Sequence, residues 1–204
     1  MKLYFAPGAC SLASHIALRE VGATFDIERV DLKEKRTNSG EDYRAVNPKG
    51  YVPALKFDDG EVLTEGPAVL QFIADQHPEK TLAPKAGTRE RARVNSHLNF
   101  VGSELHKAYT PLFSGKSFTA DERAEIDTKI AAKLDVMESA LAKNGPYLTG
   151  KDFTIADAYL GVVASWSKHV GVDLAKWPKV AALQQAVFSR PAAMEALRAE
   201  GLGA

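Results

Sequence analysis

Residues 52–67 have the sequence Val-Pro-Ala-Leu-Lys-Phe-Asp-Asp-Gly-Glu-Val-Leu-Thr-Glu-Gly-Pro. Two short runs with apolar residues, 52–57 and 61–64, flank Asp58-Asp59-Gly60. The Asp-Gly pair supplies the positive φ that a tight hairpin turn needs. The two runs are therefore predicted to be neighbouring antiparallel strands. A helix is expected from Pro67, because proline in a first helical turn forfeits no hydrogen bond.

The residues before this hairpin predict a strand, a helix and a second strand. Leu3-Tyr4-Phe5 is a short apolar run, and residues 12–21 carry apolar side chains at helical spacing. Apolar side chains alternate along residues 25–32, with a phase slip near Arg29 that suggests a bulged or edge strand. Residues 33–51 are polar and rich in turn-forming residues, and an irregular loop is expected there. This order predicts a βαβ unit completed by a hairpin and a helix, which makes residues 1–80 an α/β domain.

Beyond a linker at residues 79–87, the sequence shows no convincing strand pattern. Helices are predicted at residues 88–113, 120–143, 154–168, 178–188 and 191–199. Residues 87–204 are therefore expected to form a second, all-helical domain. Thr154 and Asp157 have the spacing of a capping box, in which each side chain binds a backbone N–H at a helix start.

Composition excludes several classes of protein. The 204 residues include 26 basic and 26 acidic side chains, so no net charge attracts nucleic acid or an anionic membrane. No run of about eighteen apolar residues predicts a membrane-spanning helix. One cysteine cannot form an internal disulfide, and the N-terminal residues lack the apolar run of a signal peptide, so a cytoplasmic protein is expected.

Cys10 follows Pro7-Gly8-Ala9 where a strand passes into a helix. A lone cysteine is most often a small apolar core residue. At a helix start, however, backbone N–H groups and the positive helix end stabilise a thiolate, which favours reactivity. No second cysteine lies three residues on, so any redox chemistry would use one thiol and an external partner.

Three further places carry polar groups that suit a ligand. Pro53 leaves the backbone of Val52 available for pairing, although an edge-strand proline is the simpler interpretation. Glu65-Gly66 precedes a helix, where N–H groups suit a carboxylate, although ordinary capping explains it equally well. His106 lies in a long predicted helix with no cluster of metal-ligand spacing near it, and no metal site is predicted.

Together these segments resemble the bacterial beta-class glutathione transferases over essentially the whole chain. The matching segments are Met1-Lys2-Leu3-Tyr4, Pro7-Gly8-Ala9-Cys10-Ser11, Asn47-Pro48-Lys49-Gly50-Tyr51-Val52-Pro53-Ala54-Leu55, Leu63-Thr64-Glu65-Gly66, Glu104-Leu105-His106-Lys107 and Phe153-Thr154-Ile155-Ala156-Asp157-Ala158-Tyr159. Each segment is weak alone, and the set is specific. The resemblance implies a thioredoxin-like first domain, a helical second domain that forms the electrophile pocket and dimer contacts, and a homodimer.

The resemblance also implies a glutathione site. Val52, with a cis bond to Pro53, would pair with the cysteinyl backbone of glutathione, and Lys35 would meet its glycyl carboxylate. Glu65 and Gly66 would hold its γ-glutamyl end. Gly66 departs from the pattern, since many relatives have serine there, so a hydroxyl is lost and the backbone N–H is kept.

The remaining implied positions concern the sulfur and the rim of the site. Cys10 and His106 are expected beside the sulfur of glutathione as the catalytic residues. Asn99, Ser103 and Glu104 match positions that line the site, some of them across the dimer interface.

The function that follows is conjugation of glutathione to apolar electrophiles, a detoxification chemistry that needs a thiolate at neutral pH. One alternative is a glutathione-dependent monothiol reductase acting through Cys10. Others are a non-catalytic binder of apolar ligands, and an isomerase or dehalogenase on the same scaffold. Cys10 would either hydrogen-bond the sulfur of glutathione or form a mixed disulfide with it, and the sequence leaves both open.

Overall fold

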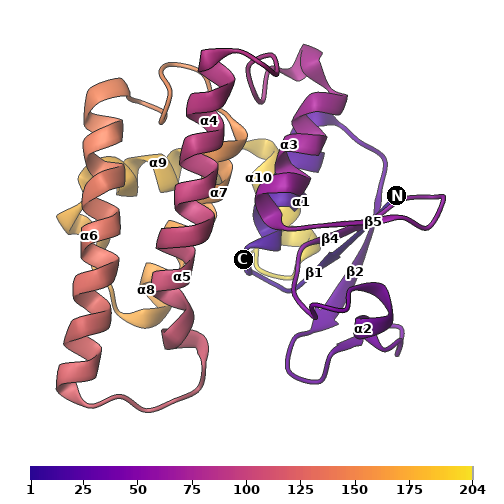
Figure 1. The fold of residues 1–204 in the computed structure, drawn as a ribbon, viewed down its shortest axis with the longest axis horizontal. Helices are drawn as coiled ribbons and strands as arrows, with labels where there is room; N and C mark the ends of the chain where they lie inside the picture. Colours follow the sequence, from indigo (N-terminus) through magenta and orange to yellow (C-terminus); the bar gives the residue numbers. More distant parts are fainter. Residues whose placement is uncertain (204) are drawn as a thin grey trace. The chain divides into compact units, whose positions relative to one another are not determined.

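The computed structural model describes residues 1–203. The chain divides into two compact units, which are drawn in Figure 1. Unit 1 comprises Met1–Ala83 and the segment from Ser189 onward, and unit 2 comprises Pro84–Phe188. Unit 1 contains the β-sheet, and unit 2 is helical, as the sequence predicts.

Unit 1 is built on a five-stranded sheet in the order β3-β2-β1-β4-β5. Its strands are β1 (Lys2–Phe5), β2 (Asp26–Asp31), β3 (Arg36–Thr37), β4 (Ala54–Lys56) and β5 (Val62–Thr64). β1 and β2 run parallel because α1 (Ser11–Val21) connects them, whereas the other neighbouring pairs are antiparallel. The predicted βαβ unit and hairpin are both confirmed.

Alternate residues of β1 face opposite sides of the sheet, since side chains alternate along a strand. Phe5 faces α1, where its ring lies 6.1 Å from the ring of His15. Tyr4 faces the other side, where its ring lies 5.6 Å from that of Tyr43 in α2 (Tyr43–Val46). The helix after the hairpin, α3 (Gly66–Gln76), packs against α1, and Pro67 stands in its first turn.

Two expectations for unit 1 are corrected. The segment 33–51 contains β3 and α2, which are too short for a hydrophobic period to reveal. The C-terminal helix α10 (Pro191–Ala199) belongs to unit 1, although the sequence pattern predicts one helical domain over residues 87–204. It packs on α1, and the Arg190 guanidinium pairs with Glu20 at 2.6 Å. Periodicity predicts an apolar helix face but not which partner covers it.

Unit 2 consists of helices. They are α4 (Arg89–Phe100), a π-helical segment η2 (Val101–Leu105), α5 (His106–Tyr109), α6 (Ala120–Asn144), α7 (Ile155–Ser165), α8 (Ser167–Val170) and α9 (Pro178–Phe188), with 3₁₀ turns at Thr110–Phe113 (η3) and Leu174–Lys176 (η4). Another 3₁₀ turn, η1 (Pro78–Lys80), lies in unit 1. The helix predicted at 88–113 is a continuous helical run from Arg89 to Phe113, with a π-helical segment inside it and a 3₁₀ turn at its end.

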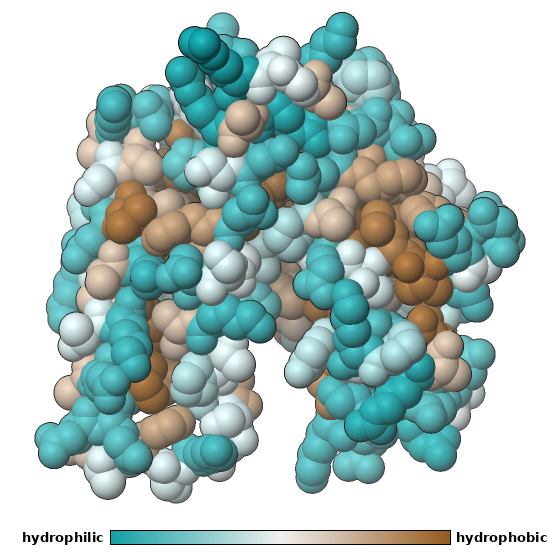
Figure 2. Space-filling view, in the orientation of Figure 1, coloured by the Kyte–Doolittle hydropathy of each residue, from teal (hydrophilic) through white to brown (hydrophobic). Residues whose placement is uncertain are grey.

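The predicted capping box at the start of α7 is confirmed. The Asp157 carboxylate accepts the Thr154 N–H at 2.8 Å, the Asp157 N–H donates to the Thr154 carbonyl at 3.0 Å, and both residues are buried. Figure 2 shows hydrophilic residues over most of one face of the molecule, with hydrophobic residues in small groups. Among residues 1–203, no helix combines the length and the hydrophobicity needed to cross a bilayer.

Candidate functional site

Cys10 stands at the N-cap of α1 and is partly buried. Its side chain makes no capping hydrogen bond to the helix. Instead, the Sγ thiol donates to the carbonyl oxygen of Val52 at 3.1 Å. This bond joins the start of α1 to the segment before β4.

The turn that carries Cys10 is held by the C-terminal segment of unit 1. The Gly8 N–H donates to Glu200 Oε2 at 3.0 Å, and Glu200 Oε1 lies 2.9 Å from His15 Nδ1. The side chains of His15 and Glu200 are both fully buried. His15 thus packs structurally, and one carboxylate joins the turn to α1.

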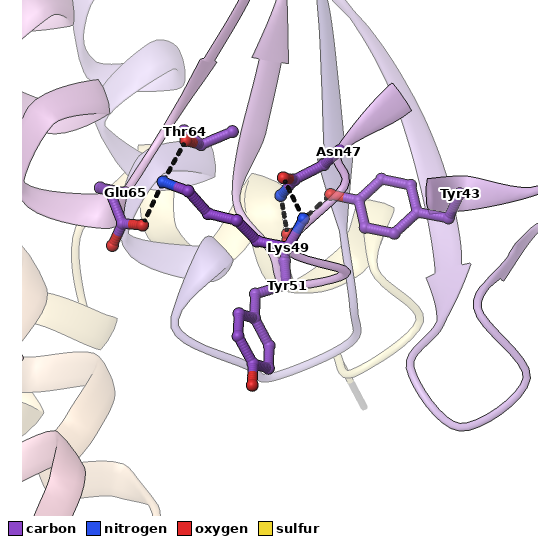
Figure 3. Close-up of polar contacts among 6 residues, drawn as sticks. All are labelled: Tyr43, Asn47, Lys49, Tyr51, Thr64 and Glu65. Carbon is purple, nitrogen blue, oxygen red and sulfur yellow. Dashed lines mark hydrogen bonds and ion pairs between the residues drawn. The ribbon is translucent and has the colours of Figure 1, made fainter. Parts of the chain in front are cut away.

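Val52 lies beside Cys10, and its bond to Pro53 is cis, as the resemblance implies. No acceptor for the Val52 N–H lies within residues 1–203. The preceding carbonyl, of Tyr51, accepts the hydroxyl of Tyr43 at 2.8 Å and Nδ2 of Asn47 at 2.7 Å (Figure 3). The backbone before β4 is therefore fixed by side chains, and Val52 presents an open donor.

Lys35 reaches the same segment from the far end of the loop. Its Nζ donates to the carbonyl of Gly50 at 2.9 Å and lies 5.5 Å from the centre of the Tyr51 ring. The Tyr51 ring is exposed and points away from the other side chains drawn in Figure 3. An ammonium in this position suits an anionic ligand group that lies along residues 50–52.

Glu65 and Gly66 stand at the start of α3, with Glu65 in the N-cap position at a φ of 71°. The Glu65 carboxylate is exposed, and Oε1 accepts from Lys49 Nζ at 2.7 Å. Lys49 Nζ also donates to Thr64 Oγ1 at 3.1 Å (Figure 3). Backbone N–H groups at a helix start favour an anion, whereas the Glu65 carboxylate favours a cation.

His106 lies in unit 2, directly after the π-helical segment. Its Nδ1 is 3.0 Å from the Tyr159 hydroxyl, and its ring meets the Trp166 ring edge to face at 4.8 Å. Burial, with a smaller effect of Lys107, lowers the pKa of His106 to about 4. The imidazole is therefore neutral at pH 7. Because Tyr159 occupies Nδ1, a ligand would have to use Nε2.

Asn99, Ser103 and Glu104 are exposed residues of unit 2. Ser103 Oγ donates to the Asn99 carbonyl at 2.8 Å, across the start of the π-helical segment. Glu104 pairs with Lys133 of α6 at 2.6 Å. Within residues 1–203, no group of three or more His, Cys, Asp or Glu side chains has the arrangement of a metal site.

Comparison with known proteins decides the family. Residues 8–76 match the model of the glutathione S-transferase N-terminal domain, and residues 120–185 match that of the C-terminal domain. The glutathione S-transferase GstA of Escherichia coli O157:H7 is 45% identical over 203 residues, which cover 99% of this chain and 100% of that protein. The chain belongs to the glutathione S-transferase family.

Solved structures agree with this membership and place the chain in the bacterial beta class. The beta-class glutathione S-transferase of Sphingomonas chungbukensis is 46% identical with a TM-score of 0.93, and the match covers 99% of this chain and 100% of that one. A sphingomonad glutathione S-transferase complexed with glutathione is also 46% identical with a TM-score of 0.93, over 100% of both chains.

Unit 1 of this glutathione S-transferase brings together several of the residues that the sequence singled out. Cys10 contacts Val52, Lys35 reaches the residues just before Val52, and Glu65 and Gly66 adjoin at the start of α3. The other four, Asn99, Ser103, Glu104 and His106, belong to unit 2.

Sequence reasoning missed several side chains that support these groups: Tyr43, Asn47, Lys49 and Glu200. Asn47 and Lys49 lie in the quoted segment Asn-Pro-Lys-Gly, so their place near the site was visible, but their contacts were not. Glu200 had no signal at all, because its partners lie 185 and 192 residues away in the sequence.

Proposed function

We propose that this member of the family is a glutathione transferase that binds glutathione along residues 50–66 and conjugates its thiol to apolar electrophiles. The N-terminal unit would bind glutathione, and the helical unit would form the electrophile pocket. Glutathione is a co-substrate, and the chemistry needs no metal.

The observation that carries the proposal is the backbone of Val52. Its N–H is open, and its carbonyl accepts the thiol of Cys10. A peptide laid along Val52 would form backbone hydrogen bonds and bring its own cysteine to the start of α1. The peptide is proposed to be glutathione, because the similar sphingomonad glutathione S-transferase was solved in complex with glutathione.

The ends of the peptide would meet charges of the opposite sign. Lys35, next to Gly50, would bind the glycyl carboxylate, and Glu65 would bind the α-ammonium of the γ-glutamyl group. The N–H of Gly66 would support the adjoining carboxylate. Asn99, Ser103 and Glu104 would line the site as the family pattern implies, some of them from the partner of a homodimer.

The chemical step requires a thiolate. The glutathione thiol loses its proton to solvent, the sulfur attacks the electrophilic carbon, a C–S bond forms, and the leaving group departs with the bonding electron pair. Cys10 would donate its S–H to the thiolate after turning from the Val52 carbonyl. Neutral His106 would donate from Nε2, since Nδ1 is bonded to Tyr159. Both donors would lower the pKa of the glutathione thiol.

A second activity is favoured by the position of Cys10 next to the proposed peptide-binding backbone. The Cys10 thiolate would attack a glutathione mixed disulfide and release the other thiol. A second glutathione would then free Cys10 and leave as glutathione disulfide. This monothiol exchange balances without a second cysteine.

The enzyme is proposed to act as a homodimer in the cytoplasm. The family pattern motivates the dimer, and a single cysteine, which cannot form an internal disulfide, motivates the reducing compartment. Light scattering at micromolar concentration is expected to give twice the mass of the chain. A monomer at all concentrations would contradict the dimer.

The test of the function combines glutathione binding by calorimetry with turnover of 1-chloro-2,4-dinitrobenzene, in which chloride is displaced. We expect both in the wild-type protein. Absence of binding and of turnover, with this and several other electrophiles, would refute the transferase. Cys10→Ala separates the two activities, because disulfide exchange should be lost while conjugation survives.

A further inference from the structure

Lys49 is the one ammonium that contacts Glu65 in the described chain. Its Nζ bridges Glu65 Oε1 at 2.7 Å and Thr64 Oγ1 at 3.1 Å (Figure 3). Both charged side chains are open to solvent, with 52% of Lys49 and 66% of Glu65 exposed. Exposed ion pairs contribute little to stability, so the fold does not depend on this pair. Its arrangement is one that a ligand can readily open.

The ligand in question carries two charges on one carbon. In glutathione the first glutamate is linked through its side chain, so its α-ammonium and α-carboxylate are both unblocked and adjacent. A protein group that recognises this end must offer one anion and one cation side by side. Lys49 and Glu65 are such a couple, and they come from two different segments, the loop before β4 and the start of α3.

We propose that Lys49 binds the α-carboxylate of the γ-glutamyl group and so determines specificity for glutathione together with Glu65. This inference rests on the proposed function. On binding, the Lys49–Glu65 pair opens, Glu65 takes the α-ammonium, and Lys49 takes the α-carboxylate. Every charge keeps a partner of opposite sign throughout, so no ion is left uncompensated.

The residue next to Glu65 leaves room for a further donor. Gly66 has no side chain that could bind a carboxylate at the start of α3. Only the backbone N–H remains at Gly66, and a carboxylate has room for more than one donor. Lys49 Nζ, which already lies at the side chain of Thr64, supplies the missing donor and adds a positive charge.

A purely supporting role makes a different prediction. If Lys49 only held Glu65 in place, its loss would weaken every interaction of Glu65, including that with the α-ammonium. If Lys49 binds the carboxylate directly, its loss should matter only for ligands that possess this carboxylate. Two analogues of glutathione separate these cases, one without the α-carboxylate (4-aminobutanoyl-Cys-Gly) and one without the α-ammonium (glutaryl-Cys-Gly).

The experiment measures the dissociation constants of glutathione and both analogues for wild type, Lys49→Met, Glu65→Gln and the control Lys33→Met. Lys33 is an exposed lysine of the same unit. We expect Lys49→Met to weaken glutathione and the desamino analogue by about tenfold and to leave the decarboxylated analogue unchanged. Glu65→Gln should weaken glutathione and the decarboxylated analogue and spare the desamino one.

The outcomes are distinct. Equal weakening of all three ligands by Lys49→Met, or no weakening of glutathione, would overturn the direct role of Lys49 while leaving the proposed function in place. Failure of wild type to bind glutathione would overturn the proposed function and this inference together. If Lys33→Met weakened binding as much as Lys49→Met, the loss of one positive charge from the protein would explain both effects. That outcome would likewise refute the direct role of Lys49.

Discussion

Asp157 is the buried acceptor that closes the start of α7, and Asp157→Asn is expected to destabilise the protein. Oδ1 accepts the Leu148 N–H at 2.8 Å, while Oδ2 accepts the N–H and the hydroxyl of Thr154 at 2.8 and 2.7 Å. Asparagine keeps one acceptor and places an amide donor where the other oxygen was. One or two buried donors would then face another donor instead of an acceptor.

The magnitude follows from these bonds. Each buried donor without an acceptor costs about 1–3 kcal/mol, so the substitution should lower the free energy of unfolding by about 2–4 kcal/mol. In a chain of this length that corresponds to a fall of about 5–15 °C in the unfolding temperature.

The effect should also depend on pH. Burial raises the pKa of Asp157 to about 6, against the lowering by its hydrogen bonds. Because the folded pKa lies above the ordinary 3.8, the stability that the carboxyl contributes is full below about pH 4 and is lost as the pH rises through 6. The difference in the free energy of unfolding between wild type and Asp157→Asn should therefore be larger at pH 5 than at pH 8.

Urea unfolding followed by circular dichroism at pH 5 and pH 8 measures this gap. Asp152→Asn is the matched control, because Asp152 is exposed and lies five residues earlier. The control should stay within about 0.5 kcal/mol of wild type. The role of Asp157 is refuted if Asp157→Asn has the same free energy of unfolding as the control. It is also refuted if the difference in free energy of unfolding from wild type is smaller at pH 5 than at pH 8.

Three further predictions concern other parts of the chain. Glu200→Ala removes the acceptor of the Gly8 N–H, so it should lower the free energy of unfolding by about 2–4 kcal/mol. The substitution should also speed the reaction of Cys10 with a disulfide reagent, and an unchanged rate would contradict this prediction. Gly161→Ala should cost about 1–3 kcal/mol in urea unfolding, since its Cβ would lie 2.8 Å from Val187, and a neutral result would contradict this. His106 should stay neutral above pH 5.5 in an NMR titration, and a titration midpoint above 6 would disprove its low pKa. The free energy of unfolding of the protein should fall as the pH drops from about 6.5 toward 4, because the unfolded chain then binds a proton that the folded His106 does not.

The parts of the fold that local chemistry dictates were predictable from sequence. Asp59-Gly60 marks the hairpin, Pro67 marks the start of α3, and the hydroxyl and carboxylate at 154 and 157 mark the start of α7, because each signal acts over a few residues. The partner of α10 was not predictable, since an amphipathic helix of nine residues fits many apolar faces.

In the candidate site, too, the residues could be found from the sequence, whereas their contacts could not. Cys10 and Glu65 are visible as residues at helix starts, and the family pattern added Val52 and Lys35. The contact between Lys49 and Glu65 joins residues sixteen apart, and only the folded chain brings them together. The hydrogen bond from Cys10 to Val52 was equally hidden, because it joins residues 42 apart in the sequence.

The return of the C-terminal segment to unit 1 has a consequence for biosynthesis. A ribosome makes the chain from its N-terminus, so the turn that carries Cys10 emerges long before Glu200, and the whole of unit 2 is translated in between. Until Glu200 arrives, the nascent N-terminal unit lacks the carboxylate that His15 and Gly8 bind in the finished protein. The contacts that hold the thiol turn therefore form only after the whole of unit 2 has been synthesised.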